Sequence, residues 1–149
     1  MDFKRKKTLL NRLLSIIDSD KKIKKIELSK RVEERQQLRR QEKLMTLERS
    51  NLISSINKGS EKGAQLDIEG MKRNSLLVRD VDIRIEKLQE RIATLESNII
   101  QVRDGITKLH KKKIKYEEYL DEITKENEVM ESKQFENEVE DLSRIRRYG

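Results

Sequence analysis

The sequence of 149 residues contains no proline, no cysteine and no tryptophan, and aromatic residues make up only 3% of it. Without proline, the chain lacks the residue that most often breaks a helix. Without cysteine, it can form neither a disulfide scaffold nor a thiolate metal site. Large apolar residues are too few and too regularly spaced for a globular core. No apolar stretch approaches the roughly 20 residues that cross a bilayer as a helix.

Charge is what the chain has in abundance. Charged residues make up 42% of it, and Glu, Lys, Leu, Arg and Ile at helical spacing are typical of long helices. The net charge of +7 is uneven, because residues 1–65 hold 18 Lys/Arg against 9 Asp/Glu, whereas residues 66–149 hold 17 against 19. The most acidic segment, 117–141, has eleven carboxylates against two lysines. Charge therefore alternates in blocks along the chain.

The strongest pattern is an uninterrupted heptad in the second half. Apolar residues there have the 3,4 spacing of the a and d positions of a coiled coil. The predicted seam consists of Val78, Val81, Ile85, Leu88, Ile92, Leu95, Ile99, Val102, Ile106 and Leu109. Two polar residues, Lys113 and Asn127, interrupt the later a positions. They either hold their polar ends in water or set the register of the helix pair. Such a seam requires a second helix to cover it.

The first half has a weaker helical seam with many charged positions. Its apolar members are Leu10, Leu14, Ile17, Leu28, Leu38, Met45, Leu52 and Ile56, and the charged ones are Lys21, Lys24, Arg31, Arg35, Glu42 and Arg49. Three of the five glycines lie between the halves, in NKGSEKGAQLDIEG at 57–70. We expect the chain to reverse near Gly59–Gly63, with a second irregularity at Gly70. Gly105 is expected to be a tolerated helical glycine at an exposed position.

These patterns predict an all-α fold, an antiparallel two-helix coiled-coil hairpin with the second helix longer. We expect one elongated hairpin over 1–149, with helix 1 at about 4–57, a tip at about 58–70 and helix 2 at about 71–146. A reversal near 61–64 places Lys4 opposite about 118–124, and the clean heptad fades after Met130. Both observations indicate that the second helix overhangs, and they favour an intramolecular hairpin over a parallel homodimer.

Enzyme activity, cofactors and metals are not expected. There is one histidine, His110, and we interpret it as an ordinary surface residue. The glycines and lysines of NKGSEKG lack the spacing of a phosphate-binding loop. Adjacent carboxylates on a helix point in different directions, and a two-helix rod offers no concave pocket.

Basic runs at 4–7, 21–25 and 110–115 raise the possibility of nucleic-acid or anionic-membrane binding. No aromatic residues interleave with them to stack on bases. Binding of this kind would be steeply dependent on salt. We expect no nucleic-acid function and no membrane insertion, and the salt dependence is the test.

Apolar and basic residues gather around the expected reversal. They are Leu66, Ile68, Met71, Lys72, Arg73, Leu76, Leu77 and Arg79. One interpretation is local packing of the tip, and the other is an exposed surface that holds a partner.

The layout of unequal charged helices and a small irregular tip, with the stretch GMKRNSLLVRDVDIRIEKLQERIATLESNI at 70–99, resembles a known family. It is similar to the central-stalk proteins of type III secretion export ATPases, the flagellar FliJ and injectisome YscO/InvI-type family. The resemblance covers nearly the whole chain. The scarcity of aromatics and the lack of tryptophan favour the injectisome branch.

The resemblance implies a non-enzymatic stalk or adaptor that links a hexameric export ATPase to the cytoplasmic ring of the export gate. It implies a monomeric hairpin in the cytoplasm at the base of a membrane-associated apparatus, and the family is also implicated in binding secretion chaperones. Carried onto this sequence, the gate-facing tip residues are Met71, Arg73, Leu76, Leu77 and Arg79. The ATPase-facing residues at the helix ends are Lys4, Arg5, Arg12, Arg144, Arg146 and Arg147. The alternative function is a generic coiled-coil scaffold or assembly subunit that dimerises through helix 2.

Overall fold

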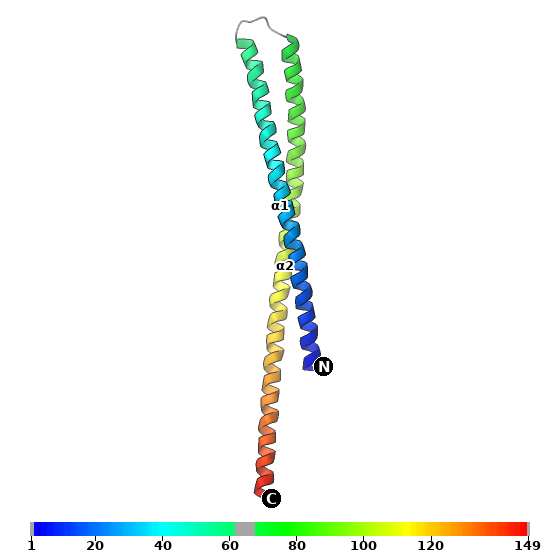
Figure 1. Ribbon diagram of the computed structural model, residues 1–149, viewed down its shortest axis with the longest axis vertical. Helices are drawn as coiled ribbons and strands as arrows, with labels where there is room; N and C mark the ends of the chain where they lie inside the picture. The colour runs from blue at the N-terminus through cyan, green and yellow to red at the C-terminus, as the bar shows by residue number, and fades with distance from the viewer. Residues whose placement is uncertain (1, 62–67, 149) are drawn as a thin grey trace. The chain divides into compact units, whose positions relative to one another are not determined.

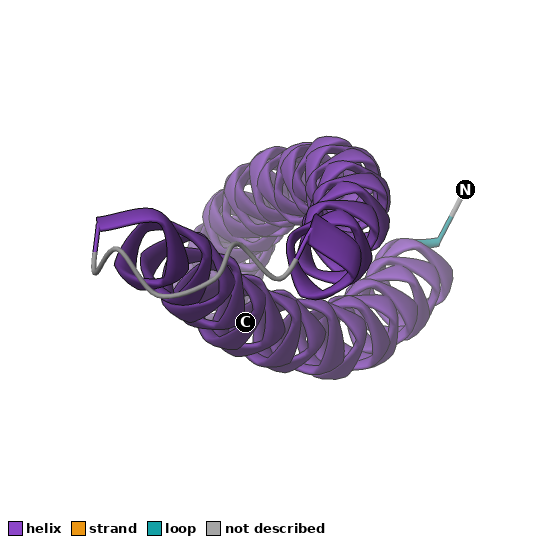
Figure 2. Ribbon diagram, turned by 90° about the horizontal axis from the view of Figure 1, so that it is seen from above, coloured by secondary structure: helices purple, strands orange, loops and turns teal. Residues whose placement is uncertain are grey.

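The computed structural model describes residues 2–61 and 68–148, and the side chains of residues 2–58 and 68–146. Two helices make up the fold: α1 is Phe3–Glu61 and α2 is Ile68–Tyr148 (Figure 1). Apart from Asp2, all described residues are helical, and none is in a strand (Figure 2). The chain is an all-α helical hairpin, as predicted, with the second helix the longer one.

The helix boundaries differ from the predicted ones at the tip. Helix α1 continues through Gly59 to Glu61, and α2 begins at Ile68, so Gly70 lies inside a helix. The irregularity predicted at Gly70 is therefore wrong. A single glycine in a helix costs only about 1 kcal/mol, which the surrounding helical hydrogen bonds outweigh when no proline is present. The rest of the expected reversal, including Gly63 and Leu66, lies outside the described residues.

The two helices begin with features that favour a helical N-terminus. The Asp2 carbonyl accepts hydrogen bonds from the backbone amides of Arg5 at 3.1 Å and Lys6 at 3.2 Å, so the Arg5 amide, one of those that a first turn leaves without a helical partner, gains one. Asp is also among the residues preferred at this capping position. In α2, Glu69 places a negative charge in the first turn, where the helix dipole favours it.

Contacts divide the chain into two units, each made of a part of α1 and a part of α2. The first unit joins Met1–Lys25 with Gly105–Gly149, and the second is Ile26–Asp104. The main apolar core belongs to the second unit. Its buried members are Leu38, Leu88, Ile92, Leu95 and Ile99, with Leu28, Val32 and Met45 packed against them. Ile99 is the most buried of these, with 1% of its surface exposed.

Polar pairs across the second unit run in antiparallel order. Arg39 Nη2 donates to Glu96 Oε1 at 2.6 Å, Gln89 Nε2 donates to Glu42 Oε1 at 3.2 Å, and Arg49 forms an ion pair with Asp82. Partners later in α1 thus meet partners earlier in α2. Each of these exposed pairs contributes little to stability, but together they show which residues of α1 and α2 lie opposite each other.

The first unit has the same antiparallel order. Lys113 Nζ lies 2.9 Å from Asp18 Oδ1, and Lys21 Nζ lies 3.2 Å from His110 Nδ1, so a step of three residues forward in α1 is matched by three back in α2. Leu10, Ile17 and Ile123 are its buried apolar residues. The core of this unit is thinner than that of the second.

Beyond Met130, α2 continues past the start of α1, as its orange and red end shows in Figure 1. Asp18 lies level with Lys113, so Lys4, 14 residues earlier, lies level with Asn127 rather than with 118–124. The offset arises because α1 extends to Glu61 and α2 begins only at Ile68. Every described side chain from residue 131 to 146 is exposed. We call residues 131–146 the α2 extension.

No helix within the described residues combines the length and the apolar character needed to span a membrane.

Candidate partner-binding surfaces

The predicted seam of α2 faces α1 in both units. Val81, Leu88, Ile92, Leu95 and Ile99 are buried. Val78, Ile85, Val102, Ile106 and Leu109 are half-buried. Since α1 already covers this seam, it is not available to a second protein while the hairpin is closed.

The charged residues that interrupt the seam of α1 also point toward α2. Lys21, Lys24, Arg31, Arg35, Glu42 and Arg49 are all half-buried. Long side chains can cover apolar surface with their stems while their charged ends reach water. The guanidinium of Arg35 does not fully reach water, because its Nε atom is buried without a hydrogen-bond partner. The face of α1 that packs against α2 thus mixes apolar residues with long charged ones.

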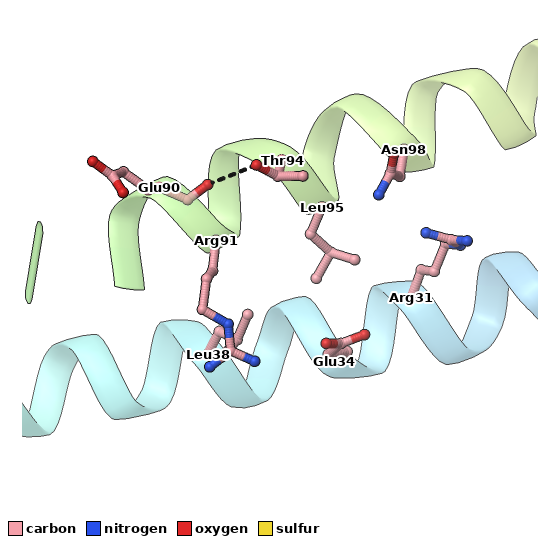
Figure 3. Close-up of a pocket in the computed structure, with 8 residues that line it drawn as sticks. All are labelled: Arg31, Glu34, Leu38, Glu90, Arg91, Thr94, Leu95 and Asn98. Carbon is pink, nitrogen blue, oxygen red and sulfur yellow. Dashed lines mark hydrogen bonds between the residues drawn. The ribbon is translucent and has the colours of Figure 1, made fainter. Parts of the chain in front are cut away.

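A hollow of about 420 Å³ lies beside the main core of the second unit. Figure 3 shows Leu95 pointing toward α1, with Arg31 and Arg91 reaching into the space between the helices. In the same view Thr94 donates a hydrogen bond to the Glu90 carbonyl, as helical threonines often do. Its lining combines charged side chains with Leu38 and Leu95 but holds no converging polar set. The hollow is a groove on the side of a helix pair.

The residues that interrupt the regular heptad of α2 have distinct surroundings. Lys113 forms its ion pair with Asp18 across the first unit, so its charged end is matched rather than merely solvated. The Asn127 side chain instead donates to Glu131 of its own helix at 3.3 Å. Gly105 is half-buried under Lys24, and a Cβ there would lie 2.6 Å from Lys24 Nζ. The expectation of an exposed Gly105 is therefore wrong, because the long Lys24 stem folds over it.

The Lys113–Asp18 pair shifts the pKa values of both groups. The hydrogen bond from Lys113, followed by the charges of Lys113, Lys21 and Lys22, lowers the pKa of Asp18, and partial desolvation opposes this. The hydrogen bond to Asp18 and the Asp18 charge raise the pKa of Lys113, with Glu117 adding to the effect. Each group therefore stays charged over a wider pH range than it would alone.

Part of the predicted tip set gathers at the start of α2. Met71, Leu76 and Arg79 line a hollow of about 440 Å³ together with Ile68, Lys72 and Ser75, and we call these six residues the tip surface. Leu76 is 63% exposed and Ile68 is exposed as well. The other two predicted residues, Arg73 and Leu77, are exposed but do not line this hollow. An apolar surface rimmed by cations suits an apolar or acidic partner.

The predicted residues at the helix ends lie in the first unit. Lys4, Arg5 and Arg12 are exposed and border Leu9. Arg144 and Arg146 are exposed on the α2 extension, and the Arg147 side chain lies outside the described residues. The structure thus brings the three α1 cations together on one helix surface.

Two apolar stripes were not recognised from the sequence. One lies on α1 at Leu9, Leu13 and Ile16, and the other lies on the α2 extension at Phe135, Val139 and Leu142. Five of these six side chains are exposed, and Leu13 is half-buried. Their 4,3 spacing is the signal that could have revealed them, but on α1 it overlaps the inner seam.

Among the described residues, no group of three or more His, Cys, Asp or Glu side chains could hold a metal ion. Exposed apolar surface of the kind found at the tip often marks a site of interaction with another macromolecule.

No family model, curated protein or solved structure matches this chain.

Proposed function

We propose that this chain is a non-enzymatic stalk or adaptor of a type III secretion apparatus that links the hexameric export ATPase to the cytoplasmic ring of the export gate. The tip surface binds the gate ring, and the helix ends in the first unit bind the ATPase. The resemblance of the sequence to the central-stalk family supplies the identity of the two partners. Its place of action is then the cytoplasm, at the base of the apparatus.

The observation that carries the proposal is the pairing of a covered seam with two separate exposed surfaces. Helix α1 buries the apolar residues of the α2 seam, so partners must bind to other surfaces. The tip surface and the cations around Leu9 are exposed and lie in different units. An adaptor requires such independent surfaces, because it holds two partners at once.

The alternative of a scaffold that dimerises through helix 2 has less support. Leu88, Ile92, Leu95 and Ile99 would form that dimer interface, yet α1 already buries them. Opening the hairpin to expose them would lose the main apolar core. Nucleic-acid binding has no specific observation in its favour, because no aromatic residue interleaves with the basic runs to stack on bases, and Phe3 and Tyr116 only flank two of them.

The test measures binding of the purified chain to the ATPase and to the gate-ring domain from the same source. Leu76→Glu should weaken binding to the gate ring at least tenfold and leave stimulation of ATP hydrolysis unchanged. Arg5→Glu with Arg12→Glu should do the reverse. Leu47→Glu is the matched control, because Leu47 is exposed and outside both surfaces.

Two results would contradict the proposal. The first is an intact chain that binds neither partner at concentrations up to about 100 μM, the range in which weak transient complexes are still detected. The second is a Leu76→Glu variant that keeps its helical circular dichroism and binds the gate ring as tightly as the unchanged chain.

A further inference from the structure

We propose that two copies of this chain form a two-fold symmetric pair, in which the acidic α2 extension of each copy packs against the basic start of α1 in the other. The contact is made by the two exposed stripes, Leu9, Leu13 and Ile16 on α1 and Phe135, Val139 and Leu142 on α2. Leu9, Ile16 and all three residues of the α2 stripe are exposed, and Leu13 is half-buried beside the inner seam.

The stripes match in spacing. Each has three apolar residues separated by four and then three positions, which is the spacing of one side of a coiled-coil seam. Leu9 and Ile16 are 51% and 57% exposed, and Phe135 and Leu142 are 68% and 61% exposed. Aligned in parallel, Leu9 meets Phe135, Leu13 meets Val139 and Ile16 meets Leu142. One alignment thus pairs all six side chains.

The charges select this pairing over the other ways in which two copies could meet. Residues 2–25 carry nine Lys/Arg against three Asp, whereas the α2 extension carries five carboxylates against Lys133, Arg144 and Arg146. Two α2 extensions would repel each other, and so would two starts of α1. Only the crossed combination joins opposite charges. In the parallel alignment, Arg5 and Glu136 occupy the g and e′ positions that form interhelical ion pairs.

The geometry allows both contacts to form at once. The α2 extension of about 16 residues spans roughly 24 Å at 1.5 Å per residue, which in this alignment covers α1 from Arg5 to Asp20. Helices α1 and α2 run in opposite directions, so a second copy turned end over end presents its α1 parallel to the first copy's extension. The same rotation returns the second extension to the first α1. The interface is therefore closed and limits the assembly to two copies.

The extension cannot reach the α1 stripe of its own copy. Asp18 lies level with Lys113, so Leu13, five residues earlier, lies level with Glu118. Val139 is 21 residues farther along a continuous helix, or roughly 31 Å. A contact between Leu13 and Val139 must therefore come from two different copies.

This pairing departs from the monomer expected from the sequence, and it does not rest on the proposed function. What the pairing would mean for ATPase binding does rest on the proposed function. Lys4, Arg5 and Arg12 border the α1 stripe, so the second copy would cover them. The pair would then be the form of the chain that is not engaged with an ATPase. The experiment below contains no ATPase, so failure of the pairing and failure of the proposed function are distinguishable.

The test is disulfide crosslinking, which the natural lack of cysteine makes specific. Under mild oxidation, the chain with both Leu13→Cys and Val139→Cys should give a covalent dimer. The chain with Ser19→Cys and Val139→Cys should not, because Ser19 lies six residues, or roughly 9 Å, out of alignment. A dimer of the Val139→Cys single variant at the same rate would show that the α2 ends meet each other and would overturn the proposal.

Sedimentation equilibrium of the unlinked chain provides the second readout. Leu142→Glu should raise the dimer dissociation constant at least about 100-fold, whereas Leu47→Glu should leave it unchanged. Arg5→Glu should weaken the dimer and Glu136→Arg in the same chain should restore it. A chain without added cysteines that stays monomeric up to about 1 mM would refute the pairing. So would a dimer that Leu142→Glu leaves intact.

Discussion

Lys113 occupies a seam position that the heptad reserves for apolar residues, and Asp18 on the facing helix compensates for it. The two ends lie 2.9 Å apart, and the Lys113 side chain is 28% exposed. A lone lysine at this position would tolerate several registers, because its flexible stem can reach water from any of them. A lysine matched by one carboxylate favours a single register, so the pair contributes more to the alignment of the helices than to their stability.

Asp18→Asn should lower the free energy of unfolding at neutral pH, and the loss should depend on pH. The pKa of Asp18 is lowered from its ordinary value of 3.8, so its contribution is present above that value and is lost as the pH falls through the lowered pKa. The pKa of Lys113 is raised from 10.5, so its contribution is present below that value and is lost as the pH rises through the raised pKa. Thermal unfolding from about pH 2 to pH 11 measures the loss of the Asp18 contribution in acid and the onset of the loss of the Lys113 contribution in alkali.

Asp20→Asn is the control for this comparison, because it removes an exposed carboxylate from the same part of α1. The difference between wild type and Asp18→Asn should be constant across the middle of the pH range and vanish in acid. A difference that persists unchanged below the lowered pKa would show that the substitution acts through something other than the ion pair.

Gly105→Ala should stabilise the first unit by about 0.5–1 kcal/mol, because alanine gains this much over glycine inside a helix. The added Cβ would meet only Lys24 Nζ and the end of its stem, which can rotate aside. Urea denaturation measures the change. A destabilised variant that Lys24→Ala rescues would show instead that the Lys24 side chain is held in place.

At the scale of the elements, the stability of the hairpin depends on a row of α2 residues seven positions apart. Ile99 is fully buried at the centre of the main core, whereas Ile100, the next residue, is 58% exposed. Ile99→Ala should therefore cost about 2–5 kcal/mol, and Ile100→Ala about 0.5 kcal/mol or less. Chemical denaturation followed by circular dichroism tests both. Equal losses would mean that the helices pair through a different face.

The fold could be predicted because α2 has an unambiguous heptad. Every seam position from Val78 to Leu109 holds an apolar residue, and a facing helix is needed to bury such a row. The extent of the helices at the tip was predicted less well, because Gly59 and Gly70 were given the weight of helix breakers. A glycine ends a helix only where the backbone is free to turn there, and its sequence position does not reveal this.

The surfaces were less predictable than the fold. The exposure of Leu76 and the shared hollow of Met71 and Arg79 follow from their positions on one helix face, which the sequence indicated only as a cluster. The two outer stripes were missed because Leu9 and Ile16 sit beside the inner seam residues Leu10 and Ile17. Adjacent apolar residues in a sequence can lie on two different faces of a helix. Which face is buried is known only once the position of the facing helix is known.

At the scale of the whole molecule, the α2 extension should be dispensable for folding. All its described side chains are exposed, so deleting residues 131–149 removes no buried apolar contact made by the side chains described up to residue 146. The shortened chain should keep the thermal midpoint of a monomeric full-length chain within a few degrees, because surface changes rarely exceed about 0.5 kcal/mol. Circular dichroism at low protein concentration measures this midpoint. A large loss of stability would mean that the extension packs on its own hairpin.

The contrast between the buried middle of α2 and its exposed end also sets two rates of amide hydrogen exchange along one continuous helix. Around Ile99, an amide can exchange only when the core opens, so protection there approaches the full stability of the hairpin. In the α2 extension, an amide needs only the transient fraying of a single helix. Deuterium should therefore enter the acidic end long before it reaches the centre, and whatever binds that end should slow its labelling without changing the core.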